Sequence, residues 1–153
     1  MNAIELLKQD HEKVKKLLEE ISSTTERAFK KRAELLGKIA MELEVHTTLE
    51  EEDFYPAFKA AGAKEELKMF HEAKEEHRAV DSLVLPDLLN TDPGTVEFAG
   101  RVKVLKELLE HHIEEEEEEM FKTAEEIMSA EQLSALGKQM EEKKAKLMKK
   151  KAA

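Results

Sequence analysis

The sequence predicts an all-α protein, an antiparallel up-down four-helix bundle with an additional C-terminal helix. Charged residues make up 39% of the 153 residues and aromatic residues only 5%, with five Gly and three Pro. This composition is typical of long helices and unlike that of turn-rich sandwiches and barrels. Apolar residues recur every three or four positions along four long segments, and short connections favour antiparallel neighbours.

Capping residues, glycine and proline indicate where the first two helices begin and end. The first is expected to begin at the capping box Asn2-Ala3-Ile4-Glu5 and to end in the Ser/Thr cluster at residues 22–25. The second is expected to start at Ser23-x-x-Glu26 and to be interrupted at Pro56 and Gly62.

Three further helices complete the predicted fold. The third starts near Lys64 and is loosely bounded by Pro86. Before the fourth, Asp92-Pro93-Gly94 places a capping residue ahead of a proline at the first helical position. A fifth, shorter helix opens at Ser129-x-x-Gln132.

Charge is unevenly distributed along the chain. The net charge is −10, yet residues 138–151 contain seven Lys against two Glu. Such a run is most simply the solvated face of a terminal helix, or it pairs with the acidic remainder of the chain. We therefore expect a bundle over residues 1–125 and a lysine-rich helix over residues 126–153 that packs on the bundle or extends from it.

Composition also narrows the class of protein. The chain has no Cys, which excludes disulfides, thiolate metal sites and Cys nucleophiles. No run approaches the roughly 20 apolar residues of a membrane span, and the first residues lack the features of a secretory signal. An acidic chain repels nucleic acid. We expect a cytoplasmic protein without a membrane span or a nucleic-acid partner, and the sequence leaves the oligomeric state open.

Four histidines and two glutamates repeat with a single offset. Adding 66 to each member of a first set gives the second set, and it also maps Tyr55 onto Phe121. In each of the four long helices one of these histidines occupies a position where the apolar stripe would otherwise require an apolar residue. The two sets are His11, His46 and Glu50, and His77, His112 and Glu116.

This repeat predicts a metal site. Unpaired imidazoles and carboxylates are costly to bury, whereas a shared metal cluster would satisfy all six groups at once. Four imidazoles and two carboxylates suit iron, with manganese or zinc less favoured. The two-fold pattern suggests two metals, and we interpret the site as a non-haem di-iron centre.

Other His and Glu motifs in the chain give weaker support for a metal site. A Glu four residues after a His is weak on its own, because thirty of the residues are Glu. His71 and His111 also have such a Glu, but both lie off the apolar stripes. The Glu-x-x-His motif of ferritin-like bundles and the His-Glu-x-x-His motif of zinc peptidases are absent. A purely structural helical bundle remains the simplest alternative.

The ordered pattern resembles the hemerythrin-like proteins, which carry the HHE cation-binding domain. The resemblance covers residues 1 to about 125. It is carried by Asp10-His11, by His46-Thr-Thr-Leu-Glu50-Glu51 followed by Phe54-Tyr55-Pro56, by Glu76-His77, and by His112-Ile-Glu-Glu-Glu116-Glu117 followed by Phe121.

The resemblance implies a four-helix bundle around two iron ions bridged by an oxo or hydroxo group. His11 and His46 would bind one iron and His77 and His112 the other, with Glu50 and Glu116 bridging. Marine oxygen carriers of this kind have an additional histidine one turn before the His of the third helix, where this chain has Ala73. Each iron would therefore keep one position open.

Two accessible irons favour chemistry in which both metals meet the ligand. We expect a small-molecule partner, namely peroxide, dioxygen or nitric oxide, with peroxide decomposition of the catalase or peroxidase kind as the leading function. The alternative is a non-catalytic protein that binds or senses oxygen, nitric oxide or iron. Whether the protein is an enzyme stays open.

Tyr55 follows the first Glu closely enough to serve as a ligand or as a hydrogen-bond donor beside the metals. On an ideal helix, however, it faces away from His46. The sequence therefore favours a packing role for Tyr55, unless the helix is distorted before Pro56.

Overall fold

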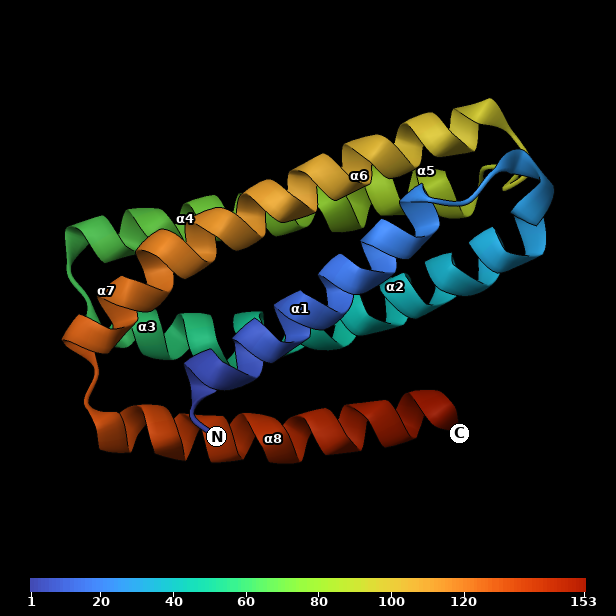
Figure 1. The fold of residues 1–153 in the computed structure, drawn as a ribbon. Helices are drawn as coiled ribbons and strands as arrows, with labels where there is room; N and C mark the ends of the chain where they lie inside the picture. Colours follow the sequence, from blue (N-terminus) through green and yellow to red (C-terminus); the bar gives the residue numbers. More distant parts are fainter.

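Helices account for nearly the whole chain, and no strand is present. The structure is a computed structural model that describes residues 1–153. Figure 1 shows long helical rods lying side by side, with the last helix along one side of the others. The prediction of an all-α protein is confirmed.

Several of the rods contain more than one helical segment. The first rod is α1 (Ala3–Ser22). The second follows the 3₁₀ turn η1 (Glu26–Ala28) and consists of α2 (Phe29–Leu49), η2 (Glu50–Phe54) and α3 (Tyr55–Ala61). The next two are α4 (Lys64–Ala79) with η3 (Val80–Val84) and α5 (Leu85–Leu89), and α6 (Val96–Glu115) with η4 (Glu116–Met120) and α7 (Phe121–Ile127). The last is α8 (Ala130–Ala152).

The capping boxes predicted at Asn2 and at Ser129 are both present. The predicted start of the second helix at Ser23 is wrong. The hydroxyl of Ser23 donates to the carbonyl of Glu19, so this side chain closes α1, and α2 begins at Phe29. Polar side chains next to a helix end can satisfy carbonyls as well as N–H groups, which is why the direction was misjudged.

The predicted cap of the fourth helix is also misplaced. Thr95 caps α6, because its Oγ1 accepts from the backbone N–H of Phe98. The carboxylate of Asp92 instead accepts from the N–H of Gly94 and closes a turn before the helix. Proline at 93 therefore belongs to the turn.

Pro56 and Pro86 do not end their helices. Each follows a π turn, η2 or η3, after which the helix resumes. A proline ring inside an α-helix collides with the carbonyl four residues earlier, and the wider π turn relieves this collision. The predicted interruption at Pro56 and the predicted boundary at Pro86 are thus local widenings of continuous rods, whereas the second rod does end at Gly62.

The helices enclose two apolar clusters. One contains residues of α1, α3, α7 and α8, and the other contains residues of α1, α2, α5 and α6. The four buried histidines occur in the same rods, each between residues of one cluster and residues of the other along the sequence. Apolar burial at about 25 cal/mol per Å² is what holds such polar groups in place.

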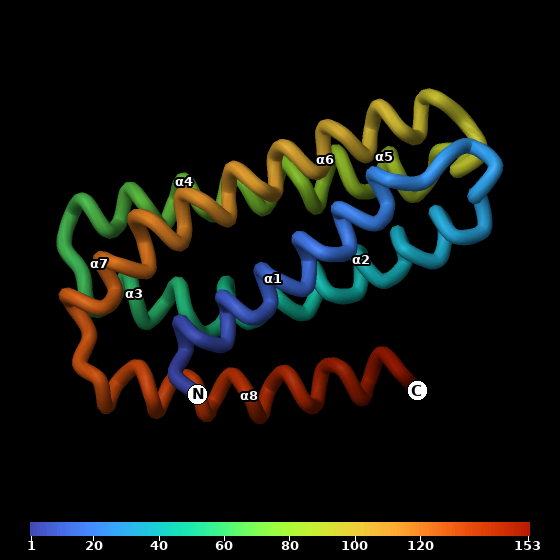
Figure 2. Tube along the Cα trace, viewed as in Figure 1, coloured from blue at the N-terminus to red at the C-terminus, as the bar shows by residue number.

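The last helix packs against α1 and α2 (Figures 1 and 2). The chain start approaches α8 closely at Gly137, where an added Cβ would lie 2.4 Å from the carbonyl oxygen of Met1. Only glycine permits this contact. The N-terminus of the chain therefore lies beside α8.

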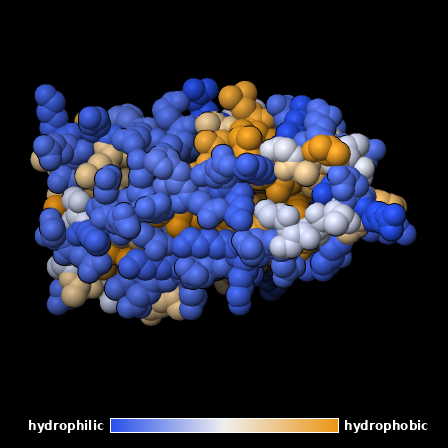
Figure 3. All heavy atoms as spheres, turned by 45° about the horizontal axis from the view of Figure 1, so that its top comes forward, coloured by the Kyte–Doolittle hydropathy of each residue, from blue (hydrophilic) through white to orange (hydrophobic).

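The surface is predominantly polar, as Figure 3 shows for one face, where an apolar patch interrupts the hydrophilic side chains. The exposed large apolar side chains include Val96, Val104 and Leu108 of α6 and Leu83 of η3. None of the helices combines the length and the apolar character that crossing a membrane requires.

Candidate metal centre

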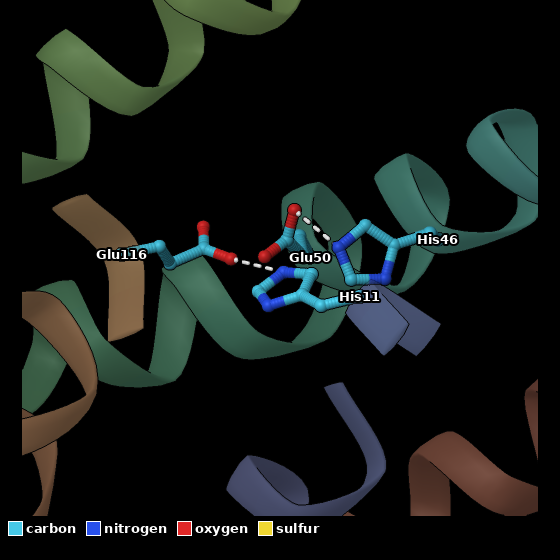
Figure 4. A group of neighbouring side chains, drawn as sticks. All are labelled: His11, His46, Glu50 and Glu116. Carbon is cyan, nitrogen blue, oxygen red and sulfur yellow. Dashed lines mark ion pairs between the residues drawn. The ribbon is translucent and has the colours of Figure 1, made fainter. Parts of the chain in front are cut away.

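The structure brings the six side chains singled out by the repeat together, and it buries all of them. They form two groups that share both glutamates. In each group the potential ligand atoms lie within 4.8 Å of one another. The first metal position consists of His11, His46, Glu50 and Glu116 (Figure 4), and the second of Glu50, His77, His112 and Glu116.

Each glutamate contacts one histidine from each position. Oε1 of Glu50 lies 3.1 Å from Nε2 of His46 and 3.0 Å from Nε2 of His77. Glu116 is placed in the same way, with Oε1 3.0 Å from Nε2 of His11 and Oε2 3.4 Å from Nε2 of His112. Two carboxylates in this arrangement can each link two metal ions.

Several of these buried atoms have short contacts but no hydrogen-bond partner. They are Nε2 of His11 and His46, both carboxylate oxygens of Glu50, and Oε1 of Glu116. Buried polar atoms in native proteins are normally hydrogen-bonded, so such atoms need an explanation. A cation in each group would satisfy them, because imidazole nitrogen and carboxylate oxygen are both ligands for iron. The donor set therefore fits a pair of metal ions.

The other ring nitrogen of every histidine is held by a carboxylate. These contacts turn each Nε2 towards the site and favour the tautomer with its proton on Nδ1. They join Nδ1 of His11 to Glu117 at 2.7 Å, of His46 to Asp10 at 2.9 Å, of His77 to Glu51 at 3.0 Å, and of His112 to Glu76 at 2.7 Å.

These four carboxylates obey the same offset of 66, since Asp10 corresponds to Glu76 and Glu51 to Glu117. All four residues belong to the motifs quoted above, but the sequence alone predicts no role for them. The signal was present in the offset itself. Adjacent residues of a helix point in different directions, so Asp10 does not hold the ring of His11 beside it. It holds the ring of His46 on the next helix, a contact that sequence spacing alone does not predict.

The carboxylates change how the buried rings titrate. Burial opposes protonation of His46, but the charge of Glu50 and the hydrogen bond with Asp10 outweigh it and raise its pKa to about 10. Burial likewise opposes protonation of His77, and hydrogen bonds with Glu50 and Glu51 raise its pKa to about 9. In the absence of metal these rings hold their protons at neutral pH.

Tyr55 contributes its hydroxyl to the site, so the packing interpretation from the ideal helix is wrong. The hydroxyl donates to Oε2 of Glu116 at 2.5 Å and lies 3.3 Å from Nε2 of His77. The cause is η2, because a π turn contains one extra residue and rotates the side chains after it by roughly 100°. This is the distortion before Pro56 on which the alternative depended.

Tyr55 remains a proton donor in these surroundings. Burial and the charges of Glu116 and Glu50 raise the pKa of its hydroxyl well above the usual value. Its ring also stacks on His77, with centroids 5.4 Å apart, as the ring of Phe121 stacks on His11 at 5.7 Å. The two aromatic rings that stack on these histidines therefore differ by one hydroxyl.

Two small cavities reach the site, and between them they touch the four histidines and Glu116. The central cavity, of about 20 Å³, touches all four histidines and is otherwise lined largely by apolar side chains of the four rods. The second cavity, which we call the Ala73 opening, has a volume of about 30 Å³ and touches His112 and Glu116. Each has room for a molecule about the size of water.

The remaining histidines lie outside this site. His71 and His111 are both exposed. His111 comes within 3.2 Å of Glu115 and 3.9 Å of Glu76, which forms a third, partly exposed group of possible ligands. Exposed acidic groups of this kind are common without a metal.

The fold and the buried histidine and carboxylate groups define a helical, cation-binding protein. A family profile described as the hemerythrin HHE cation binding domain matches residues 2–124. The chain therefore belongs to the hemerythrin HHE family, as the ordered motifs indicated.

A solved structure supports this assignment. The crystal structure of a hemerythrin HHE cation binding domain-containing protein from Mycobacterium kansasii, a homologue of Rv2633c, superposes with a TM-score of 0.83. It is 30% identical, and the match covers 96% of this chain and 87% of that one. The hemerythrin-like fold is thus shared with a solved protein.

Two curated relatives differ in length from this chain. The uncharacterized protein Rv2633c of Mycobacterium tuberculosis is 31% identical over 122 residues, which are 79% of this chain and 71% of that protein. A DNA nickase of Nostoc sp. is 26% identical over 148 residues, which are 96% of this chain but only 40% of the nickase.

Proposed function

We propose that this protein binds two iron ions in the buried site and decomposes peroxide there. His11 and His46 hold the first ion, His77 and His112 the second, and Glu50 and Glu116 link them. The observation that carries the proposal is the convergence of buried ring nitrogens and carboxylate oxygens without hydrogen-bond partners. The bundle over residues 1–125 supplies this site, and the helix over residues 126–153 covers one side of it.

When bound, two iron ions supply the two electrons needed to reduce one peroxide to water and recover them by oxidising a second peroxide to dioxygen. The overall change, two peroxides to two waters and one dioxygen, needs no external reductant. The protein's own contribution is to hold the groups around this chemistry. The four Nδ1 contacts fix the histidine rings, and the hydroxyl of Tyr55 offers a proton at Glu116.

Ala73 supports peroxide chemistry over simple oxygen storage. It is buried one turn before His77, and its small side chain supplies no ligand. The second metal position therefore has two histidines, as the first has, and both ions would keep a position for a small molecule.

The alternative is reversible binding of dioxygen, nitric oxide or iron without turnover. The same site and cavities would serve such a protein. Stable adducts without loss of peroxide would favour this binder, and rapid peroxide loss with release of dioxygen would favour the enzyme. The similarity to a DNA nickase does not change the proposal, since a net charge of −10 opposes contact with DNA phosphates.

The first test is the iron content per chain together with the near-ultraviolet spectrum. We expect about two irons, with the charge-transfer bands of an oxygen-bridged iron pair. His46→Leu and His112→Leu should each lose iron and lower the stability of the iron-loaded protein, because ligand binding to the native state adds to its free energy of unfolding. Wild-type protein that takes up no iron, together with leucine variants of increased stability, would establish the structural-bundle alternative instead.

A further inference from the structure

The offset of 66 allows the two sides of the site to be compared position by position. Ala73 corresponds to Leu7, and Glu119 corresponds to Asp53. The Ala73 opening therefore has a counterpart beside the first metal position, lined by Leu7, Leu6 and Phe54 where the opening has Ala73, Glu72 and Met120. All three of these counterpart side chains are buried.

Helix α8 closes this counterpart. Met140 is fully buried in the same apolar cluster as Leu6 and Leu7. On the same side of α8, Lys144 pairs with Asp10, and Nζ of Lys143 lies 2.7 Å from Oδ1 of Asp53. The side of the first metal position is thus filled by leucine, covered by a helix and neutralised by two lysines.

No element covers the other side in this way. Glu76, the counterpart of Asp10, forms ion pairs only with histidines, and Glu72 and Glu119 have no Lys or Arg within salt-bridge distance. The opening consequently has a rim of four carboxylates, Glu72, Glu76, Glu115 and Glu119, around a small cavity that reaches His112 and Glu116. Such a rim repels anions and admits neutral molecules.

The central cavity, in contrast to the Ala73 opening, is surrounded in the same way at both metal positions. Ten of its twelve lining residues form five pairs related by the offset, for example Val14 with Val80 and Leu43 with Leu109. It touches both histidine pairs equally, so it is shared by the two metal positions. The Ala73 opening and the hydroxyl of Tyr55 near His77 distinguish the second position, and α8 with its two lysines distinguishes the first.

We propose that small uncharged ligands such as peroxide and nitric oxide enter through the Ala73 opening and reach the site at the second metal position, while Leu7 and α8 close the first. This inference rests on the proposed binding of two irons. It goes further by assigning the entry route, the metal position that is reached first, and a preference for uncharged ligands.

The test is to close the opening with the residue found at its counterpart. Ala73→Leu fills the cavity, and the readout is the rate of nitric oxide binding to the iron-loaded, reduced protein in a stopped-flow spectrometer. We expect a rate at least about tenfold lower, which corresponds to about 1.4 kcal/mol in the barrier. The matched control is Ala99→Leu, on α6 and away from both cavities, which should bind at the wild-type rate.

Leu7→Ala completes the comparison, because α8 still covers that side and the rate should not change. Iron content is measured for every variant, and Ala73→Val replaces Ala73→Leu if the larger side chain prevents iron loading. A wild-type rate in the closed variant with two irons would overturn the route, and so would a rate that responds to Leu7→Ala alone. Wild-type protein that binds no iron would instead refute the proposed function itself.

The rim provides a second readout. Glu72→Gln with Glu119→Gln removes two exposed charges, and it should accelerate binding of the anion azide to the oxidised protein while leaving the nitric oxide rate unchanged. An unchanged azide rate, or an equal change for both ligands, would show that neither passes the carboxylate rim.

Discussion

Lys144 and Asp10 form an ion pair across 134 residues of sequence, and this pair extends the surroundings of the first metal position into α8. One carboxylate oxygen of Asp10 contacts Lys144, and the other lies 2.9 Å from Nδ1 of His46. Nδ1 of His112 has a carboxylate partner at the counterpart position, but that carboxylate, Glu76, has no lysine. The carboxylate that holds His46 is therefore tied to a further helix by a lysine, and the carboxylate that holds His112 is not.

Removing this lysine should weaken iron binding. Loss of a carboxylate that orients a ligating histidine typically lowers metal affinity by about 10- to 100-fold, and we expect this for Asp10→Ala. Lys144→Met acts one contact further away and should cost less, roughly tenfold or below. Competition with a chelator measures both values. Lys149→Met, at an exposed position of the same helix, is the control, and equal losses in the two lysine variants would contradict a specific role for Lys144.

Tyr55→Phe tests the hydrogen bond to Glu116. A hydrogen bond to a charged group contributes roughly 1.5–3 kcal/mol, so urea unfolding of the metal-free variant should show a decrease of that order in the free energy of unfolding. The ring itself should be tolerated, because Phe121 occupies the counterpart position and stacks on His11. A visible phenolate-to-iron band in the wild type that disappears in the variant would instead make Tyr55 a ligand.

Stability should depend on pH in opposite ways with and without metal. The pKa values of His46 and His77 are raised to about 10 and about 9, against about 6.5 in an unfolded chain. The stabilisation from these protonated rings is complete below about pH 6.5 and is lost as the pH rises towards 9 and 10. Metal-free protein should therefore become less stable between pH 7 and pH 10.

Iron requires the deprotonated nitrogen, so its binding should strengthen as the pH rises. At pH 7 loading should release about two protons from these two rings, since both pKa values lie well above neutrality. Unfolding curves from pH 6 to 10 and calorimetry in buffers of different ionisation enthalpy measure the two effects. Metal-free stability that is constant across this range would disagree with protonated, ion-paired rings.

Gly137→Ala tests the docking of α8. A methyl group there would lie 2.4 Å from the carbonyl oxygen of Met1. Overpacking of this kind typically lowers the free energy of unfolding by about 1–3 kcal/mol. We expect lower stability in urea and faster proteolysis within α8. Gly100→Ala is the matched control, because nothing lies within 4 Å of its added Cβ, and a helical alanine there should stabilise by roughly 0.5–1 kcal/mol. Similar effects at both glycines would argue against a tight contact at Gly137.

Periodicity and the repeat were sufficient to predict the helical fold and which six side chains would meet. Each histidine interrupts an apolar stripe, so its direction follows from the stripe, as His11 follows from Leu7 and Val14. The same reasoning failed for Tyr55, because a π turn changes the phase of a helix and no residue type marks it. Pro56 is the one available signal: it predicts an interruption or a distortion of the helix, but not the π turn that brings Tyr55 to the site.

Contacts between distant elements could not be predicted from local pattern. Lys144 and Asp10 each look like ordinary surface residues of an amphipathic helix, and their pairing depends on how α8 is placed. The Ala73 opening likewise exists because α8 packs against α1 and α2 and leaves this part of α4 uncovered. Helix caps were predicted correctly where the box is reciprocal, as at Ser129, and wrongly where one polar side chain could serve either neighbour, as at Ser23.

The pairing of Asp10 with Lys144 has a consequence for the order of events during synthesis. All six side chains of the candidate metal centre have been made by residue 116, whereas the lysine that pairs with Asp10 beside His46 follows only in α8. A nascent chain can thus assemble the histidine and glutamate groups before that side is closed. Proteolytic trimming of α8 would return a mature molecule to the same condition, in which Asp10 has lost its lysine partner and α8 no longer covers that side.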